Sequence, residues 1–135
     1  MQGRQRRILV VEDDPTTSDI LRILLEDSGC SIVTAENGEE ALRRAQEGDV
    51  DLITLDLGLP GIDGRELLRR FRDEPNTARV PVIVITGMWF DTDRSGDVAA
   101  VLEKPFDAEE LEKAVRQVLE LHPNRTSRPQ APPQS

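Results

Sequence analysis

Short apolar runs alternate with amphipathic segments along residues 8–121, and this alternation constrains the fold more than any other feature of the sequence. The apolar runs predict strands at residues 8–11, 32–35, 52–55, 80–85 and 99–102. The first, third and fourth are almost entirely apolar, as strands buried on both faces of a sheet are, whereas the second is more polar, as an edge strand is. The pattern therefore predicts repeated βα units around a mostly parallel sheet.

The first predicted helix begins at Asp14 and Pro15, where an acidic side chain can cap the free amides and proline suits the first turn, and it stops at Gly29. Its apolar face is predicted to contain Ile20, Leu21, Leu24 and Leu25. Further helices are predicted at residues 38–46 and 64–72 and from Asp107 onward, where Glu110 completes a capping box. Residues 90–97 are polar and predict either one or two helical turns or a loop.

Charge and cysteine content exclude several classes of protein. The 135-residue chain has a formal net charge of −9, and its length suits one domain. Five of the 17 basic residues are arginines outside residues 8–122, so this range carries 12 basic against 26 acidic side chains. An acidic domain repels nucleic acid, because such affinity comes largely from Lys and Arg at phosphates. We therefore expect Arg43, Arg44, Arg69, Arg70 and Arg72 to lie on solvent-exposed helix faces.

The single cysteine, Cys30, cannot form an internal disulfide bond. The sequence shows neither a secretory leader nor an apolar run long enough for a membrane span, so we expect a cytoplasmic protein with no membrane contact. By composition we expect a flexible N-terminus at residues 1–7, one domain at 8–121, and a disordered proline-rich tail or linker at 122–135.

Unusual polar residues stand at the carboxyl ends of four predicted strands. Asp13 and Asp14 follow the first strand, Asp56 the third, Thr86 the fourth and Lys104 the fifth. In open α/β sheets these strand ends share one edge, where ligands bind. Crowded carboxylates resist ionising together, so the acids at this edge call for a compensating cation such as a divalent metal ion.

The segments "EDD", "LDLGLPGIDG", "ITG" and "EKPF" occur in this order at the strand ends, and together they resemble the receiver domain of two-component response regulators, the CheY-like superfamily. The resemblance covers residues 8 to about 121. It implies a doubly wound, flavodoxin-like (βα)₅ three-layer sandwich with strand order 2-1-3-4-5. Lys104 follows Thr86 by 18 positions, which by this resemblance is about four fewer than usual, so we also expect the fourth helix to be short or irregular.

By the same resemblance, Asp56 is expected to accept a phosphoryl group, with Thr86 and Lys104 contacting its oxygens. Mg²⁺ is expected to bind Asp14, Asp56 and the backbone carbonyl of Gly58 directly, and Asp13 through water. The expected activity is that of a signalling domain that catalyses only its own phosphotransfer and slow dephosphorylation. The Lys104–Pro105 peptide bond is expected to be cis.

The implied partners are a sensor histidine kinase or phosphotransfer protein and a downstream partner or fused output domain; a homodimer is also compatible with the resemblance. Val101 stands where the family commonly has an aromatic switch residue, so we expect that the loop with Trp89 and Phe90 responds to phosphorylation instead; the alternative is that Trp89 only covers the core or a dimer contact. The alternative function is that of a receiver-like protein-interaction module that is not phosphorylated.

Overall fold

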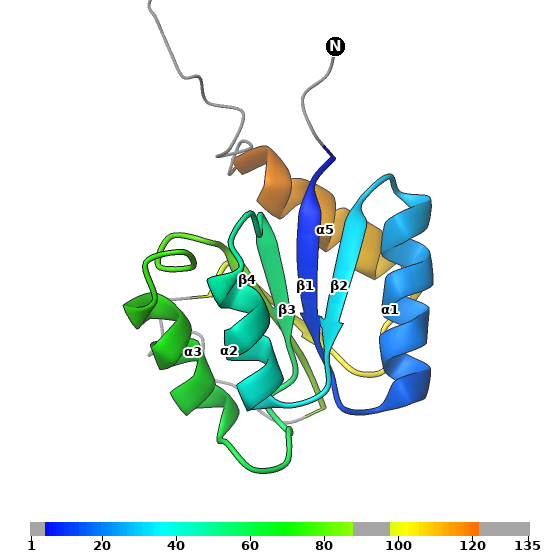
Figure 1. The fold of residues 1–135 in the computed structure, drawn as a ribbon. Coiled ribbons are helices and arrows are strands. Elements are labelled where there is room, and N and C mark those ends of the chain that lie inside the picture. Colours follow the sequence, from blue (N-terminus) through cyan, green and yellow to red (C-terminus); the bar gives the residue numbers. More distant parts are fainter. Residues whose placement is uncertain (1–4, 88–97, 122–135) are drawn as a thin grey trace, which may run out of the picture.

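The computed structural model describes residues 5–87 and 98–121, and these form one five-stranded parallel sheet with helices on both faces (Figure 1). The strand order is β2-β1-β3-β4-β5, which confirms the expected order. The strands are β1 (Arg7–Val11), β2 (Ser31–Ala35), β3 (Leu52–Leu55), β4 (Val82–Thr86) and β5 (Ala100–Glu103). As predicted, the more polar second strand lies at an edge of the sheet.

Two separate apolar clusters hold the three layers together. On one face, α1 (Pro15–Asp27) and α5 (Ala108–Leu121) bury Leu21, Leu25, Leu111, Val115 and Val118 against the sheet. On the other face, α2 (Gly38–Gln46) and α3 (Gly64–Asp73) bury Ala41, Ala45, Leu67, Leu68 and Phe71. Because successive strand residues point to opposite faces, a central strand needs apolar side chains at nearly every position, and β1, β3 and β4 supply them.

The helix starts lie where their capping residues predict. Asp14, Asn37 and Asp63 accept hydrogen bonds from the free amides at the starts of α1, α2 and α3. At α5, the Asp107 side chain accepts from the Glu110 amide at 2.8 Å and the Glu110 side chain accepts from the Asp107 amide at 3.0 Å, so the predicted capping box is confirmed.

Three local predictions need correction. Ile20 was predicted on the buried face of α1 but is 46% exposed, because one residue corresponds to about 100° of helix rotation and the buried stripe centres on Leu21 and Leu25. β4 begins at Val82 rather than residue 80, since the Val80 amide donates to the Thr77 carbonyl in a turn and Pro81 has no amide hydrogen. β5 begins one residue later than predicted, at Ala100.

Some predictions lie outside the described residues. These are the form of residues 90–97, the short fourth helix, the response of Trp89 and Phe90, and the nature of the tail at 122–135. The Lys104–Pro105 peptide bond is cis, as expected. Within residues 5–87 and 98–121, no helix is long and apolar enough to span a membrane.

Thr54, in the middle of β3, is a polar residue inside the core. It is 1% exposed and pairs in register with Val10 on one side and Ile83 on the other. Among the described residues, its hydroxyl has no hydrogen-bond partner. Another buried threonine, Thr77, donates its hydroxyl to the Phe71 carbonyl at 2.6 Å. Burying a hydroxyl costs desolvation free energy, and a hydrogen bond within the protein offsets this cost. A buried hydroxyl without a partner therefore destabilises the fold.

Replacing Thr54 by Val should therefore stabilise the fold, whereas the same substitution at Thr77 should destabilise it. We expect Thr54→Val to raise the free energy of unfolding by about 1 kcal/mol and Thr77→Val to lower it by about 1 kcal/mol. Urea denaturation of the two variants beside the wild type measures both changes. Equal destabilisation by both substitutions would show that the Thr54 hydroxyl does have a partner in solution.

Candidate functional site

Three carboxylates meet at the carboxyl ends of β1 and β3. Glu12, Asp13 and Asp56 each offer one oxygen, and these oxygens lie within 4.8 Å of one another. The backbone holds them together, because the Glu12 amide donates to the Ala35 carbonyl of β2 and the Asp56 amide donates to the Val11 carbonyl of β1. The parallel pairing thus continues one residue past the strands and carries the acids with it.

Lys104, directly after β5, supplies the positive charge of this site. Its ammonium donates to Glu12 Oε1 at 2.9 Å and to Asp56 Oδ2 at 3.0 Å, while its backbone amide donates to the Thr86 carbonyl at 3.0 Å. With all groups ionised, three carboxylates face one ammonium, and two negative charges stay uncompensated. The site is therefore suited to a divalent cation.

Burial opposes the charged form of both members of this ion pair, and hydrogen bonds favour it in both. Burial of the Lys104 ammonium opposes its charged form, but hydrogen bonds to Glu12 and Asp56 outweigh burial and keep the pKa of Lys104 above its ordinary value. Burial also raises the pKa of Glu12, although the Lys104 ammonium and the Asp14 amide favour its ionised form. The Glu12 side chain is 2% exposed and that of Asp56 is 10% exposed, whereas Lys104 keeps 26% exposure. Lys104 and the exposed Asp13 are thus the more solvent-accessible members of the site.

The structure places Asp14 apart from the group, contrary to our expectation of a direct metal ligand. Its Oδ2 accepts from the Thr17 amide at 3.0 Å and from the Thr17 hydroxyl at 2.6 Å, and these bonds hold the pKa of Asp14 below its ordinary value. Glu12 takes its place beside Asp13 and Asp56. Pro15 at the first helical position was the sequence signal for this arrangement, since it makes Asp14 the capping residue.

Thr86 is the last residue of β4 and is fully buried. It pairs in register with Glu103, the residue before Lys104. The four expected strand ends thus meet at one edge of the sheet, and the Asp14 side chain caps α1 instead of joining the carboxylates there.

Close packing fixes the loop that follows Asp56. The Gly58 amide donates to Asp56 Oδ1 at 2.9 Å, so the loop turns back towards the carboxylate. Gly64, the first residue of α3, lies so close to Leu57 that an added Cβ would be 2.6 Å from the Leu57 Cα atom. Ile62 packs in the same way on Gly38, at the start of α2. The two glycines allow the loop to lie against the helices that cover this face.

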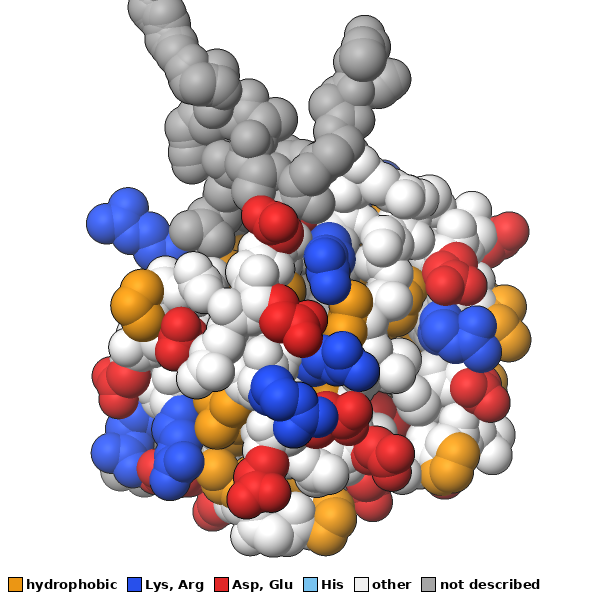
Figure 2. Space-filling view, viewed as in Figure 1, with side chains coloured by type: hydrophobic (Ala, Val, Ile, Leu, Met, Phe, Trp, Pro, Cys, Tyr) orange, Lys and Arg blue, Asp and Glu red, His pale blue; other side chains and the backbone are white. Residues whose placement is uncertain are grey.

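The basic helix residues serve mainly local ion pairs. Arg43 and Arg44 pair with Glu40, and Arg69 and Arg70 pair with Glu66. Figure 2 accordingly shows acidic and basic side chains interspersed over this face, without a continuous basic patch among the described residues. Arg72 was predicted to be exposed but is partly buried, since it donates to the carbonyls of Thr77 and Val80 at 3.1 and 2.7 Å.

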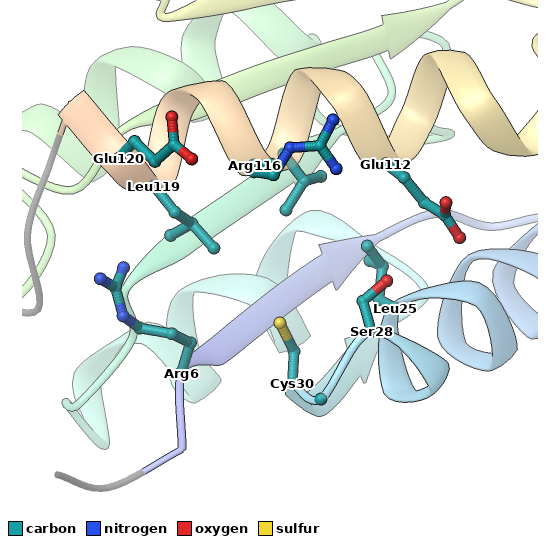
Figure 3. Close-up of a pocket in the computed structure, with 10 residues that line it drawn as sticks. Arg6, Leu25, Ser28, Cys30, Glu112, Arg116, Leu119 and Glu120 are labelled. Carbon is teal, nitrogen blue, oxygen red and sulfur yellow. The ribbon is translucent and has the colours of Figure 1, made fainter. Parts of the chain in front are cut away.

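A pocket lies at the opposite end of the sheet, between α1 and α5 (Figure 3). Its volume is about 370 Å³, and its lining includes Leu25, Cys30 and Leu119. The sulfur of Cys30 points towards α5, but burial raises the pKa of this thiol and so reduces its reactivity. Charged side chains converge at Glu12, Asp13, Asp56 and Lys104 and not at this larger cavity. The carboxylate group of Glu12, Asp13 and Asp56 is therefore the better candidate for a reactive site.

The oxygen donors of the carboxylate group fit a hard divalent cation. Mg²⁺ and Ca²⁺ bind carboxylate and carbonyl oxygens, and Mg²⁺ commonly takes only one or two carboxylates and keeps several waters. The exposed carboxylate of Asp13 leaves room for such waters. The residues present therefore fit a magnesium site, as the sequence resemblance implies, although Asp14 lies outside it.

Comparisons with known proteins assign the chain to one family. Residues 8–116 match the model described as "Response regulator receiver domain". The chain is 34% identical over 118 residues to protein PilH of Pseudomonas aeruginosa, with 84% of this chain and 97% of PilH covered. It is similar to the solved structure of response regulator TrrA of Thermotoga maritima in complex with Mg²⁺-BeF, with 34% identity, a TM-score of 0.74, and 85% and 100% of the two chains covered.

Some relatives are longer than this chain. It is 39% identical over 117 residues to the phosphate regulon transcriptional regulatory protein PhoB of Rhizobium meliloti, with 84% of this chain but only 52% of PhoB covered. The chain spans about half the length of several such transcriptional regulators. The similarity to them therefore concerns one part of each regulator.

Replacing Gly64 by Ala should destabilise the fold by about 1–3 kcal/mol, because the new methyl group would overlap the backbone of Leu57. Chemical denaturation measures this change. Gly87→Ala is the matched control, since an added Cβ there meets no atom of the described residues within 4 Å. Equal stability of the two variants would mean that the loop after Asp56 moves away without cost.

Replacing Asp14 by Ala should lower stability through loss of the α1 cap, whereas Asp14→Ser should keep the cap. Both variants should bind Mg²⁺ within about threefold of the wild type, while Asp13→Asn should weaken binding about tenfold or more. Thermal unfolding and isothermal titration with MgCl₂ separate the two effects. A tenfold loss of Mg²⁺ affinity in Asp14→Ser would show that Asp14 does bind the metal ion.

Proposed function

This chain belongs to the family of response regulator receiver domains, and we propose that it accepts a phosphoryl group on Asp56 in a Mg²⁺-dependent reaction and signals through the resulting conformational change. A receiver domain is a signalling domain rather than a classical enzyme. The observation that carries the proposal is the position of Asp56, a nearly buried strand-end carboxylate that Lys104 contacts and Glu12 and Asp13 surround.

In the proposed reaction, an Asp56 oxygen attacks the phosphorus atom of a phosphohistidine donor. The new P–O bond forms as the P–N bond breaks, and the bonding electron pair returns to the donor imidazole, so an aspartyl phosphate results. The Gly58 amide and the Lys104 ammonium, which bind the two oxygens of Asp56, orient the carboxylate for this attack.

Asp13 and Asp56, together with the backbone carbonyl of Gly58, would hold Mg²⁺, and the charge of Glu12 would add to its attraction. When bound, the ion supplies positive charge that offsets the charge developing on the transferred group. Asp14 is not in this set because its carboxylate caps α1, and Asp13 takes the direct role that was expected of Asp14. The Mg²⁺-BeF complex of the related TrrA supports the choice of metal.

Lys104 and Thr86 would contact the phosphoryl oxygens after transfer. Lys104 already lies at the Asp56 carboxylate, so its ammonium needs little movement to reach an attached phosphoryl group. Thr86 would donate its hydroxyl from the neighbouring strand end, and its backbone carbonyl already accepts from the Lys104 amide. A shift of either residue would also move β4 and β5, and these strands would carry the conformational change away from the site.

Receiver domains interact with histidine kinases and output domains. For this chain, we propose a sensor histidine kinase or phosphotransfer protein as donor, and a separate partner or a fused domain as output. Its similarity to part of longer transcriptional regulators is compatible with a fused output domain, whereas its similarity to nearly all of PilH is compatible with a separate partner. A cytoplasmic location and a homodimer stay predictions.

The central test is phosphorylation of the full chain with acetyl phosphate and MgCl₂. Intact-mass spectrometry should show the gain of one phosphoryl group in the wild type, and borohydride trapping with peptide mapping should place it on Asp56. Asp56→Asn and omission of Mg²⁺ should each reduce labelling at least about a hundredfold. No mass gain in a folded, Mg²⁺-bound wild type would favour the alternative, a receiver-like interaction module that is not phosphorylated.

A further inference from the structure

The cavity between α1 and α5 lies at the opposite end of the sheet from the carboxylates, and the proposed function does not use it (Figure 3). Its volume of about 370 Å³ is within the range of pockets that bind small ligands or segments of chain. Leu25, Val115 and Leu119 give its lining an apolar part. The cavity therefore offers apolar surface that a further group can cover.

Two glutamates of the lining have no ionic partner. Glu112 and Glu120 lie about two turns apart on α5, towards opposite ends of the cavity (Figure 3). Within residues 5–87 and 98–121, neither carboxylate makes a hydrogen bond or an ion pair. Arg116 is four residues from each and pairs with neither, whereas arginines of α1, α2 and α3 pair with acids at this spacing. The two carboxylates are thus open to a cationic partner.

The chain itself continues from the edge of this cavity. Glu120 belongs to the lining and α5 ends at Leu121, so residues 122–135 begin next to the cavity. This segment lies outside the described residues; its sequence contains Arg125, Arg128 and four prolines but no acidic side chain. Because the domain has an excess of acidic residues, it attracts such a segment.

The spacing of the two arginines matches that of the two glutamates. Proline-rich chains favour an extended helix with three residues per turn and a rise of about 3.1 Å per residue, which would place Arg125 and Arg128 on one side and about 9 Å apart. Glu112 and Glu120 are separated by about 12 Å along α5, a difference that their side chains can bridge. Pro123 belongs to a residue type common in turns, so the chain can reverse direction before Arg125.

We propose that residues 125–129 of the same chain dock in the cavity between α1 and α5. Arg125 pairs with Glu120, and Arg128 pairs with Glu112. The aliphatic parts of the arginines cover the apolar lining. Because the segment is attached to α5, its effective concentration is in the millimolar range, and weak contacts suffice to hold it. This interaction goes beyond the function given above and does not rest on it.

A zero-length cross-link tests the two contacts in the full chain. The double variant Arg125→Lys, Arg128→Lys keeps both charges and supplies amines that a carbodiimide joins to nearby carboxylates. Peptide mass spectrometry should find cross-links from these positions to Glu120 and Glu112 in at least about tenfold excess over cross-links to Asp27. Asp27 is the matched control, since it is exposed at the end of α1 but lies outside the lining.

Isotope labelling identifies which chain supplies the segment. In an equal mixture of ¹⁴N- and ¹⁵N-labelled protein, cross-links within one chain should predominate. Two results overturn the proposal. One is equal cross-linking to Asp27 and to the two glutamates, and the other is cross-linking mainly between labelled and unlabelled chains, which would make a second copy the occupant.

The single cysteine reports on access to the cavity without any added label. Cys30 belongs to the lining, and its sulfur points towards α5 (Figure 3). Iodoacetamide should alkylate it at least about threefold faster in the full-length variant Arg125→Glu, Arg128→Glu, and at the wild-type rate in the double lysine variant. Loss of nearby positive charge alone would slow alkylation by raising the thiol pKa, so a faster rate indicates an opened cavity.

An unchanged or slower Cys30 rate in the double glutamate variant overturns the proposal. Both variants change only residues beyond α5, and the cross-linking experiment gives an answer that is independent of Cys30. Neither measurement involves phosphorylation or Mg²⁺. Failure of the docking proposal and failure of the proposed function are therefore distinguishable.

Discussion

The arrangement of the carboxylates depends on the hydrogen bonds that the Lys104 ammonium donates to two of them. Glu12 and Asp56 are both almost buried, and two such acids at close range would repel each other without a cation between them. Lys104 donates to both, and it does so from the fifth strand, 92 residues from Glu12 along the chain. The repulsion between these two acids is therefore reduced only when the whole sheet has formed.

The parallel register of the sheet brings these distant groups together. In a parallel sheet all strands end at the same edge, and hydrogen bonds beyond β1, β3 and β5 extend the pairing by one residue into the acids and the lysine. The helices cover both faces, and among the described residues the convergent charged side chains lie at this edge. The site is consequently a product of topology, and few of its residues are close in sequence.

Close packing of the loop after Asp56 also helps to arrange the site. Gly38 and Gly64 allow Ile62 and Leu57 to approach the helices more closely than any side chain at those positions would permit. The loop in turn presents the Gly58 amide to Asp56. Packing on one face of the sheet thus orients a carboxylate oxygen at its edge, which is the kind of support that a reactive group requires.

The sequence by itself determined the α/β class, the central strands, the helix starts and the set of strand ends that form the site. These features follow from local causes, namely apolar periodicity, capping side chains and proline at the first helical turn. The resemblance added the strand order and the expected roles of Asp56, Thr86 and Lys104, which no local pattern contains. The exposure of Ile20 and the partners of Arg72 depended on neighbours distant in sequence, and only the tertiary structure decided them.

The three consecutive acids show what local sequence patterns cannot predict. From the sequence, Glu12, Asp13 and Asp14 were equally acidic, and Asp13 and Asp14 were chosen for the metal. The fold instead brings Glu12 and Asp13 close to Asp56, and the metal ligands stay a prediction. The capping role of Asp14 could be predicted from Pro15, but the burial of Glu12 could not. The burial of Glu12 results from the alternation of side chains along β1 and from the contact with Lys104, directly after β5. This contact exists only after long-range pairing has brought β5 to its place beside β4.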